Sequence, residues 1–490
     1  MTGYDMPKQP SIGDLLKNAR AAAGLTQEAL ATRAGVSARV ISDLERNVDH
    51  APRASTIELL VAALPLSAQE REQFEIAARG DQREPRQEPA RGQTSGPLPL
   101  AGRRDERKRL ERHVTGDGPP LLVIAGEPGV GKTRLLHEAA AIAATDGLTV
   151  LQGTVGAGGA AMRDPVVDAV RRATQRRSAV LLRHELRGCA WLVRVIPELA
   201  SGPIDPLPSE RLPDEQEAEL TAAAVVRFLS NIRGPAGVLL TLDNLGLADD
   251  ASVGLLARLI HSGGDVPLRI VAAYREGDLS QGAGLSPLLG RLAHEQLVTH
   301  LTLEPLAPNE AADLFDAAAG GGIPVSLAER VAEHCGGVPF YLVAWAEEMR
   351  VSQSEPTLDQ LPWAIRQSVR TRVEATTPPA RPVLEALAVA GGRATSSLLA
   401  ALGAQPEETI VACLESAARQ HLAQEDGQAY RFAYEVIGTA VEADMGTARR
   451  HVLRGRLASL LQRDDHPDTS SERAYHLSVL RRGNRRNLRG

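Results

Sequence analysis

The stretch from Leu121 to Thr133, LLVIAGEPGVGKT, constrains the fold of this chain more than any other. It begins with four consecutive apolar residues, which is typical of a strand buried on both faces in a parallel sheet. A short glycine-rich segment follows, and residues 134–144 then continue with the apolar spacing of a helix. The order of strand, tight loop and helix predicts an α/β domain with a parallel sheet.

The loop within this stretch fits the pattern G-x-x-x-x-G-K-[ST] at every fixed position. Its glycines let the backbone curl so that several N–H groups point inward, and the next helix adds its unpaired N–H groups and its positive dipole end. Such a loop binds phosphate, with Lys132 near the β- and γ-phosphates of ATP or ADP and the Thr133 hydroxyl on Mg²⁺. A glycine-rich turn that binds nothing is the alternative, and the complete order of elements argues against it. The residues predicted to bind nucleotide are Gly126, Glu127, Pro128, Gly129, Val130, Gly131, Lys132, Thr133 and Arg134.

The length of 490 residues exceeds what one hydrophobic core serves, so about three or four domains are expected. The three cysteines are far apart in sequence and belong to no C-x-x-C pair or Cys/His cluster, which indicates neither a disulfide framework nor a zinc site. No signal peptide opens the chain and no run of 18 apolar residues occurs. We therefore expect a cytoplasmic protein without a membrane partner.

The first 80 residues show a succession of short helices. Residues 11–24 have the apolar spacing of an amphipathic helix, and Thr26 is placed to cap a second helix. A tight turn containing Gly35 follows, and Ser37 is placed to cap a third helix over residues 38–47. Two short helices joined by such a turn predict a helix-turn-helix.

This segment resembles the DNA-binding domain of Xre/Cro-family repressors over residues 12–64. The matching text runs R-x-x-x-G-L-T-Q-x-x-L-A from Arg20, A-G-V-S from Ala34 and I-S-x-L-E from Ile41. By that resemblance Arg20 and Glu45 form an internal ion pair, and the partner is a double-stranded DNA operator. The residues that would face DNA are Gln27, Ser37, Ala38, Arg39, Ser42 and Asp43.

A helical module of the same fold that binds a protein is the alternative for this domain. Asp43 occupies a position where a basic or amide residue would be better suited to contact phosphates or base edges of DNA. Residues 1–80 hold nine Lys and Arg against ten Asp and Glu, so no basic surplus supports non-specific affinity for DNA. The net charge of −6 does not indicate nucleic-acid binding either, so the DNA hypothesis rests on the motif, whose fit favours it.

Apolar segments alternate with helical ones after the phosphate loop. A helix is expected over residues 215–232, and a strand that ends in a carboxylate is expected over residues 237–243. That strand has the form of a Walker B strand, whose Asp243 reaches the Mg²⁺ shell. The alternation predicts a three-layer α/β fold. Further strands are predicted over residues 148–154, 268–274 and 297–303.

Several later motifs resemble the STAND-class ATPases, which are AAA+-related proteins of LuxR/AfsR type. The text LPLAGRRDE from Leu98 resembles their short motif before the phosphate loop, and CGGVPF, residues 335–340, carries the G-x-P signature of their helical domain. A region resembling their winged helix begins at residue 361. The resemblance implies that Pro339 packs near the adenine and that Arg275 is a polar sensor within reach of the γ-phosphate.

One position departs from the STAND pattern, and the role of another has an alternative interpretation. Tyr434, in the text FAYE, stands where the relatives carry the histidine that senses ADP. For Arg275 the alternative is a surface arginine paired with Glu276 or Asp278.

The chemistry of hydrolysis depends on the residue after Asp243. STAND relatives usually carry a second acidic residue there, whereas this chain has Asn244. An amide can position water but cannot accept its proton, so ATP binding with at most slow hydrolysis is expected. Asp249 or Asp250 could stand in as the base.

Together these features predict a bacterial transcription regulator in which an N-terminal helix-turn-helix is switched by the nucleotide state of a STAND-type ATPase module. A homodimer or nucleotide-dependent oligomer and a separate sensor protein are possible partners. The alternatives are an NTPase for signalling or remodelling whose N-terminal domain docks a protein, and a scaffold with a relic pocket. The expected domains are a helix-turn-helix (1–80), a flexible linker (81–97), a P-loop NTPase (98–306), a helical domain (307–358), a winged-helix-like domain (359–445), and a C-terminal helix with a basic tail (446–490).

Overall fold

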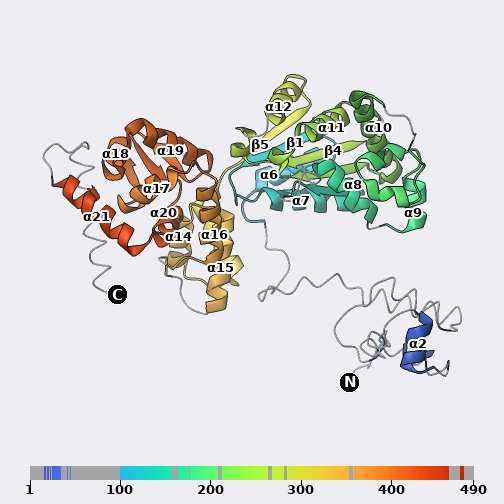
Figure 1. Cartoon of the computed structure of the whole chain (residues 1–490), viewed down its shortest axis with the longest axis horizontal. Coiled ribbons are helices and arrows are strands. Elements are labelled where there is room, and N and C mark those ends of the chain that lie inside the picture. The colour runs from blue at the N-terminus through green and yellow to red at the C-terminus, as the bar shows by residue number, and fades with distance from the viewer. Residues whose placement is uncertain are drawn as a thin grey trace. The chain divides into compact units, whose positions relative to one another are not determined.

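The computed structural model divides the chain into two compact units, Met1–Ser95 and Gly96–Gly490, and we describe each by itself (Figure 1). In the first unit the structure describes residues 16, 17, 19, 20, 23, 25–34, 41, 45 and 64. In the second it describes residues 100–156, 164–175, 177–207, 212–262, 267–280, 284–352, 357–358, 360–462 and 475–478. Within these ranges no helix is long and apolar enough to cross a membrane.

The described part of the first unit contains helix α2 (Gln27–Ala34), which Thr26 caps by accepting a hydrogen bond from the Ala29 amide at 3.1 Å. Arg20 and Glu45 form the expected ion pair at 2.5 Å, and the side chain of Glu45 is almost fully buried. The Arg20 guanidinium, by hydrogen bonding, holds the pKa of Glu45 below its usual range. Among the described residues of this unit, the buried apolar ones are Leu16, Leu30, Ala31, Ile41 and Leu64.

A five-stranded parallel sheet forms the centre of the second unit, with strand order β2-β3-β4-β1-β5. All six residues of β1 are buried, as expected for an inner strand covered on both faces. Every strand predicted downstream of the first is present within one residue of its expected bounds. The strands are β1 (Leu121–Gly126), β2 (Thr149–Thr154), β3 (Val238–Asp243), β4 (Leu268–Ala273) and β5 (Val298–Leu303).

Two hydrophobic clusters cover the faces of this sheet, which confirms the three-layer prediction. Alternate residues of β1 point to opposite faces, so Leu122 packs with one cluster and Val123 with the other. Helices α6 (Arg104–Val114) and α7 (Lys132–Thr145) cover one face (Figure 1). The other face is covered by α8 (Pro165–Gln175), α10 (Asp214–Ile232), α11 (Asp250–His261) and α12 (Leu285–His294), with the shorter α9 (Ala179–Glu185), η2 (Ala190–Arg194) and η3 (Pro197–Ser201) nearby.

Three helices follow the sheet: α13 (Pro308–Ala319), α14 (Val325–His334) and α15 (Pro339–Ser352). Beyond them, a three-stranded antiparallel sheet of order β6-β8-β7 is combined with helices in the succession helix, strand, helix, helix, strand, strand, which is that of a winged helix. The elements are α16 (Trp363–Glu374), α17 (Ala380–Val389), β6 (Arg393–Thr395), α18 (Ser396–Gly403), α19 (Glu407–Arg419), β7 (Ala423–Asp426), β8 (Ala429–Phe432), α20 (Glu435–Ala443) and α21 (Thr447–Leu461). One hydrophobic core runs through this region from Leu306 to Leu461, so its helical and winged-helix parts pack as one body.

Candidate functional site

The phosphate loop connects β1 to α7 at the carboxyl end of β1. Gly126, Gly129 and Gly131 have φ angles of 151°, 84° and 110°, which side-chain-bearing residues rarely adopt. Helix α7 starts at Lys132, directly after the last of these glycines. The loop therefore has the conformation that its sequence predicts, with Thr133 and Arg134 in the first turn of the helix.

Lys132 is 8% exposed and folds back over the loop. Its ammonium group donates to the carbonyls of Gly126 at 2.9 Å and Glu127 at 2.8 Å. Burial, and then the nearby charge of Arg275, lowers the pKa of Lys132 to about 8. The side chain is still mainly protonated at pH 7, so it presents a positive charge at the loop.

Thr133 and Asp243 meet beside this charge. The Thr133 hydroxyl donates to the Asp243 carboxylate at 2.6 Å, which joins the start of α7 to the end of β3. The other Asp243 oxygen accepts the backbone N–H of Asn244 at 2.8 Å. One hydroxyl and one carboxylate form the small all-oxygen donor set that suits Mg²⁺, which keeps its remaining positions for water and substrate phosphate.

Three residues were considered for water activation, and the structure gives Asn244 and Asp249 hydrogen bonds of their own. Asn244 has a φ of 56°, in the left-handed region that asparagine tolerates better than most residues. Asp249 caps helix α11: its Oδ1 accepts the Ser252 N–H at 2.9 Å and the Ser252 hydroxyl at 2.6 Å. A carboxylate occupied in this way is poorly placed to take a proton from water. Asp250 is the first residue of α11.

The remaining residues of the predicted nucleotide site also lie near the loop. Arg275 follows β4 by two residues and is exposed. Burial raises the pKa of Asp278, one of the two carboxyl groups named in the surface-arginine alternative, and the charge of Arg275 opposes this rise. Pro339 starts α15, and the N–H of its neighbour Phe340 donates to the Gly129 carbonyl at 3.1 Å. The G-x-P segment thus contacts the phosphate loop directly.

Two contacts of the phosphate loop have no counterpart in the sequence predictions. Arg103, just before α6, donates to the Val130 carbonyl at 3.2 Å and to the Glu304 carbonyl at 2.6 Å. The half-buried Tyr434 hydroxyl, at the start of α20, donates to the Glu127 carboxylate at 2.5 Å. Burial raises the pKa of Glu127, although the Tyr434 bond opposes this change. Arg103 belongs to a motif that the sequence analysis identified, but no pattern in the sequence predicts a contact between Glu127 and Tyr434.

A cavity of about 380 Å³ lies where Glu127 and Tyr434 meet the winged-helix region, and His421 lines it. Burial, and then the charges of Arg372 and Lys132, lowers the pKa of His421 to about 4, so this imidazole is neutral at pH 7. Arg372 is buried and donates to the Tyr341 hydroxyl at 2.8 Å. Aromatic and basic side chains of the C-terminal region thus gather next to the phosphate loop.

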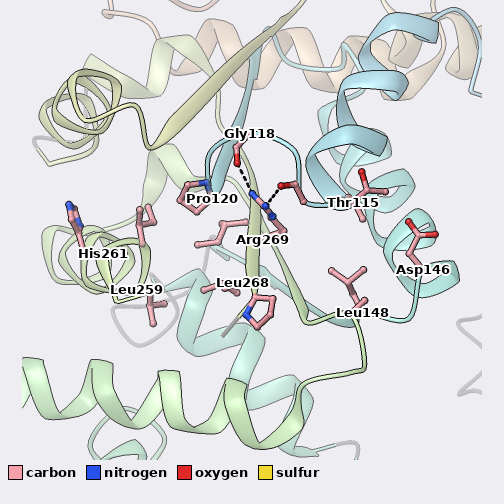
Figure 2. Close-up of a pocket in the computed structure, with 15 residues that line it drawn as sticks. Thr115, Gly118, Pro120, Asp146, Leu148, Leu259, His261, Leu268 and Arg269 are labelled. Atoms are coloured by element: carbon pink, nitrogen blue, oxygen red, sulfur yellow. Dashed lines mark hydrogen bonds between the residues drawn. The ribbon is translucent and has the colours of Figure 1, made fainter. Parts of the chain in front are cut away.

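A larger cavity, of about 840 Å³, lies at the opposite edge of the sheet, where the strands begin (Figure 2). Arg269 points into it and donates to the carbonyls of Gly118 at 2.8 Å and Pro119 at 3.2 Å, and also to the carbonyl of Gly116. These bonds use the guanidinium to tie the segment before β1 to β4. No residue of the phosphate loop is among those that line this cavity, so it is separate from the predicted nucleotide site.

The predicted DNA-facing residues fall mostly outside the described part of the chain. Ser37, Ala38, Arg39, Ser42 and Asp43 are not among the described residues, and neither are the predicted linker and the basic tail. Gln27 is the first residue of α2, and its side-chain amide donates to Glu45 at 2.7 Å.

Two families match the chain, one in each unit. The AAA ATPase domain family matches residues 99–271, and the helix-turn-helix family matches residues 16–71. The chain carries an AAA ATPase domain behind an N-terminal helix-turn-helix. The matched ATPase range contains the phosphate loop with strand β1, and Asp243 with strand β3. The combination of a helix-turn-helix with an ATPase domain, expected from the sequence, is confirmed.

The chain is also similar, at low identity, to solved structures. A Walker-type ATPase of Pyrococcus abyssi is 15% identical over 70% of this chain and 96% of its own, with a TM-score of 0.43. A RuvB variant of Thermotoga maritima is 17% identical over 69% of this chain and 94% of its own, with a TM-score of 0.35. A STAND protein with a tetratricopeptide repeat sensor from Pyrococcus horikoshii is 15% identical over 79% of this chain and 49% of its own, with a TM-score of 0.31. No curated protein sequence matches the chain.

Proposed function

We propose that this chain is a transcription regulator in which ATP or ADP, held with Mg²⁺ by the AAA ATPase domain, controls binding of the helix-turn-helix to a double-stranded DNA operator. The proposal includes a cytoplasmic location, pairing of chains into a homodimer or nucleotide-dependent oligomer, and a separate sensor protein that supplies the signal. ATP binding rather than turnover sets the state of the switch.

Nucleotide binding is supported by the arrangement at the start of α7. The Lys132 ammonium now donates to two loop carbonyls, and phosphate oxygens would take the same hydrogens as charge-assisted bonds. Thr133 and Asp243, already in contact at 2.6 Å, would hold Mg²⁺, whose role is to neutralise phosphate charge. Asn244 cannot accept a proton from water, so we expect hydrolysis of the bound ATP to be slow.

The bond between Tyr434 and Glu127 is the observation that carries the switch. It joins the phosphate loop to the winged-helix region, and the Phe340–Gly129 bond joins the same loop to α15. In our proposal ADP leaves the loop in this position and keeps both contacts with the C-terminal region, whereas ATP shifts the loop and changes or breaks them. Differential contacts of this kind are what a ligand needs to shift a conformational equilibrium.

We expect Tyr434→Phe to speed the release of a fluorescent ADP analogue by about tenfold, because one hydrogen bond to a buried carboxylate contributes about 1.5–3 kcal/mol. The phenylalanine ring keeps the packing of the tyrosine and loses only the hydroxyl. Stopped-flow fluorescence measures the release rate. Tyr430→Phe is the matched control, since Tyr430 lines the same cavity without bonding to the phosphate loop. Equal release rates in the Tyr434→Phe and wild-type chains would show that the bond does not couple the two parts.

On the DNA side, we expect Arg39→Ala and Ser42→Ala each to weaken operator binding by about 1–3 kcal/mol, as is usual for side chains that touch base edges. ATP affinity should stay unchanged in both variants, because the substitutions lie in the other unit. Fluorescence anisotropy on a selected operator, with ATP, with ADP and without nucleotide, measures both the DNA affinity and its dependence on nucleotide. If a chain lacking residues 1–80 bound the same DNA, the helix-turn-helix would not be the reader.

The charge balance of the first 80 residues favours a second candidate function. With nine basic against ten acidic residues, this domain could dock a protein while the ATPase domain drives signalling or remodelling. That function requires sustained ATP turnover, whereas the regulator requires nucleotide-dependent DNA binding. Measuring turnover with and without DNA separates the two.

A further inference from the structure

The AAA ATPase domain leaves the proton acceptor for ATP hydrolysis unassigned. Asn244 follows Asp243 and cannot accept a proton, and the Asp249 carboxylate is engaged by Ser252 at the start of α11. A carboxylate with a free oxygen is needed at the carboxyl edge of the sheet, where the phosphate loop and Asp243 lie. Asp278 meets this requirement.

Asp278 lies in the short helical turn η5 (Glu276–Ser280), which follows β4. Its N–H donates to the Arg275 carbonyl at 3.0 Å, so the turn is tied to the end of the strand that carries the sensor candidate. Strand β4 lies between β3, which ends in Asp243, and β1, which leads into the phosphate loop. In a parallel sheet these strand ends meet at one edge, so the turn belongs to the same edge as the nucleotide site.

The Asp278 side chain packs against η4 (Leu245–Leu247), the turn directly after Asn244. A Cβ placed on Gly246 would lie 2.6 Å from the Cβ of Asp278 and 3.3 Å from its Oδ2. The first of these distances is too short for real Cβ contacts, so the absence of a side chain at Gly246 is what admits Asp278. The carboxylate is thereby brought next to the segment where relatives carry their catalytic acid.

One oxygen of this carboxylate is free. Asp278 Oδ2 is buried and, within the part of the chain that the structure describes, has no hydrogen-bond partner. A buried polar atom without a partner destabilises the fold, so packing alone does not explain its position. Burial raises the pKa of Asp278, and the charges of Arg275 and Lys132 lower it, which places this carboxylate in the electrostatic field of the phosphate-binding residues.

We propose that Asp278 is the general base for ATP hydrolysis in this chain, with its carboxylate accepting a proton from the attacking water. The water oxygen forms a bond to the γ-phosphorus, and the bond from that phosphorus to the β,γ-bridging oxygen breaks. ADP leaves with the bridging oxygen, and the proton on Asp278 passes to solvent or phosphate when the products depart. The inference rests on the proposed ATP binding. It adds the residue that sets the rate of ATP hydrolysis, and therefore the lifetime of the ATP-bound state.

The test compares Asp278→Asn with the wild-type full-length chain. Single-turnover hydrolysis of γ-labelled ATP should be slower by about 100-fold or more, the usual contribution of a general base. The dissociation constant for ATP, from calorimetry, should stay within a factor of about three, since an amide preserves the shape of the carboxyl group and one accepting oxygen.

Two further variants sharpen the comparison. Glu276→Gln removes an exposed carboxylate from the same turn, so it should hydrolyse ATP at the wild-type rate. Asp249→Asn keeps a good helix cap while removing the competing carboxylate, and a loss of turnover there would transfer the role to Asp249. Formate added to Asp278→Ala should restore part of the hydrolysis rate, which a merely structural role for Asp278 would not allow.

Several results would overturn the inference. A wild-type hydrolysis rate in the Asp278→Asn chain would overturn the assignment. A fall in ATP affinity that matches the fall in rate would also overturn it, because Asp278 would then position the nucleotide and not act as the base. A wild-type chain that binds ATP and shows no hydrolysis over several hours would remove it too. A wild-type chain that binds no ATP would instead overturn the proposed function, and the calorimetry distinguishes that failure from the others.

Discussion

Lys132→Ala is expected to weaken ATP binding by at least about 100-fold while leaving the fold intact. The ammonium group donates two hydrogen bonds, both to loop carbonyls, and hydrogen bonds to charged groups contribute about 1.5–3 kcal/mol each. If phosphate oxygens take both, about 3 kcal/mol or more is lost with the side chain, and each 1.4 kcal/mol is tenfold in affinity. The hydrophobic clusters of the sheet do not contain this side chain, so thermal unfolding should change little.

Lys108→Ala is the matched control for this prediction. Lys108 lies on α6, its side chain is 71% exposed, and its ion pair with Asp105 is long, at 3.8 Å. Removing it takes away one lysine charge from the same domain without touching the phosphate loop. Calorimetry should give wild-type ATP affinity for this variant, and equal affinity in the Lys132→Ala chain would contradict the assigned site.

Gly336→Ala is expected to break the contact between the winged-helix region and the phosphate loop. Gly336 has a φ of 60°, and an added Cβ would lie 1.8 Å from Cδ1 of Tyr434, so the ring must move. Displacing the ring removes the hydroxyl from Glu127. The backbone strain costs about 1–2 kcal/mol, and the overlap adds about 1–3 kcal/mol. We expect a lower midpoint of thermal unfolding together with faster release of bound ADP.

Gly427→Ala separates these two effects. Gly427 has a similar φ of 66°, and a Cβ added there would meet nothing within 4 Å. That variant should show the backbone strain alone, with ADP release at the wild-type rate. If both glycine variants lost the same stability and released ADP alike, the overlap with Tyr434 would not matter.

The parts of the site that could be predicted from the sequence are those whose pattern lies within a few consecutive residues. The glycines of the phosphate loop, Lys132 and Thr133 act through local backbone geometry, so their pattern alone predicts their positions. Asp243 was found because its strand is apolar over its length and ends in a carboxylate. The Arg20–Glu45 pair was predicted through a resemblance, because its two members are 25 residues apart and carry no local signal.

The parts that sequence did not predict depend on how distant elements pack. Tyr434 reaches Glu127 across 307 positions, and Arg103 reaches Glu304 across 201. The free oxygen of Asp278 arises from its packing against the turn at Gly246, which no periodicity encodes. The cap role of Asp249 could have been read from Ser252 three residues later, since Asp and Ser at that spacing commonly start a helix.

The position of Arg103 has a mechanical consequence. The backbone that comes from the helix-turn-helix unit enters the ATPase domain next to this residue, whose guanidinium is bonded to Val130 in the phosphate loop and to Glu304 after β5. If two paired units bound separate half-sites on DNA, as we propose, tension along the chain would reach the ATPase domain at that guanidinium. The loop that would hold the nucleotide would then be among the first parts of the domain to bear this tension.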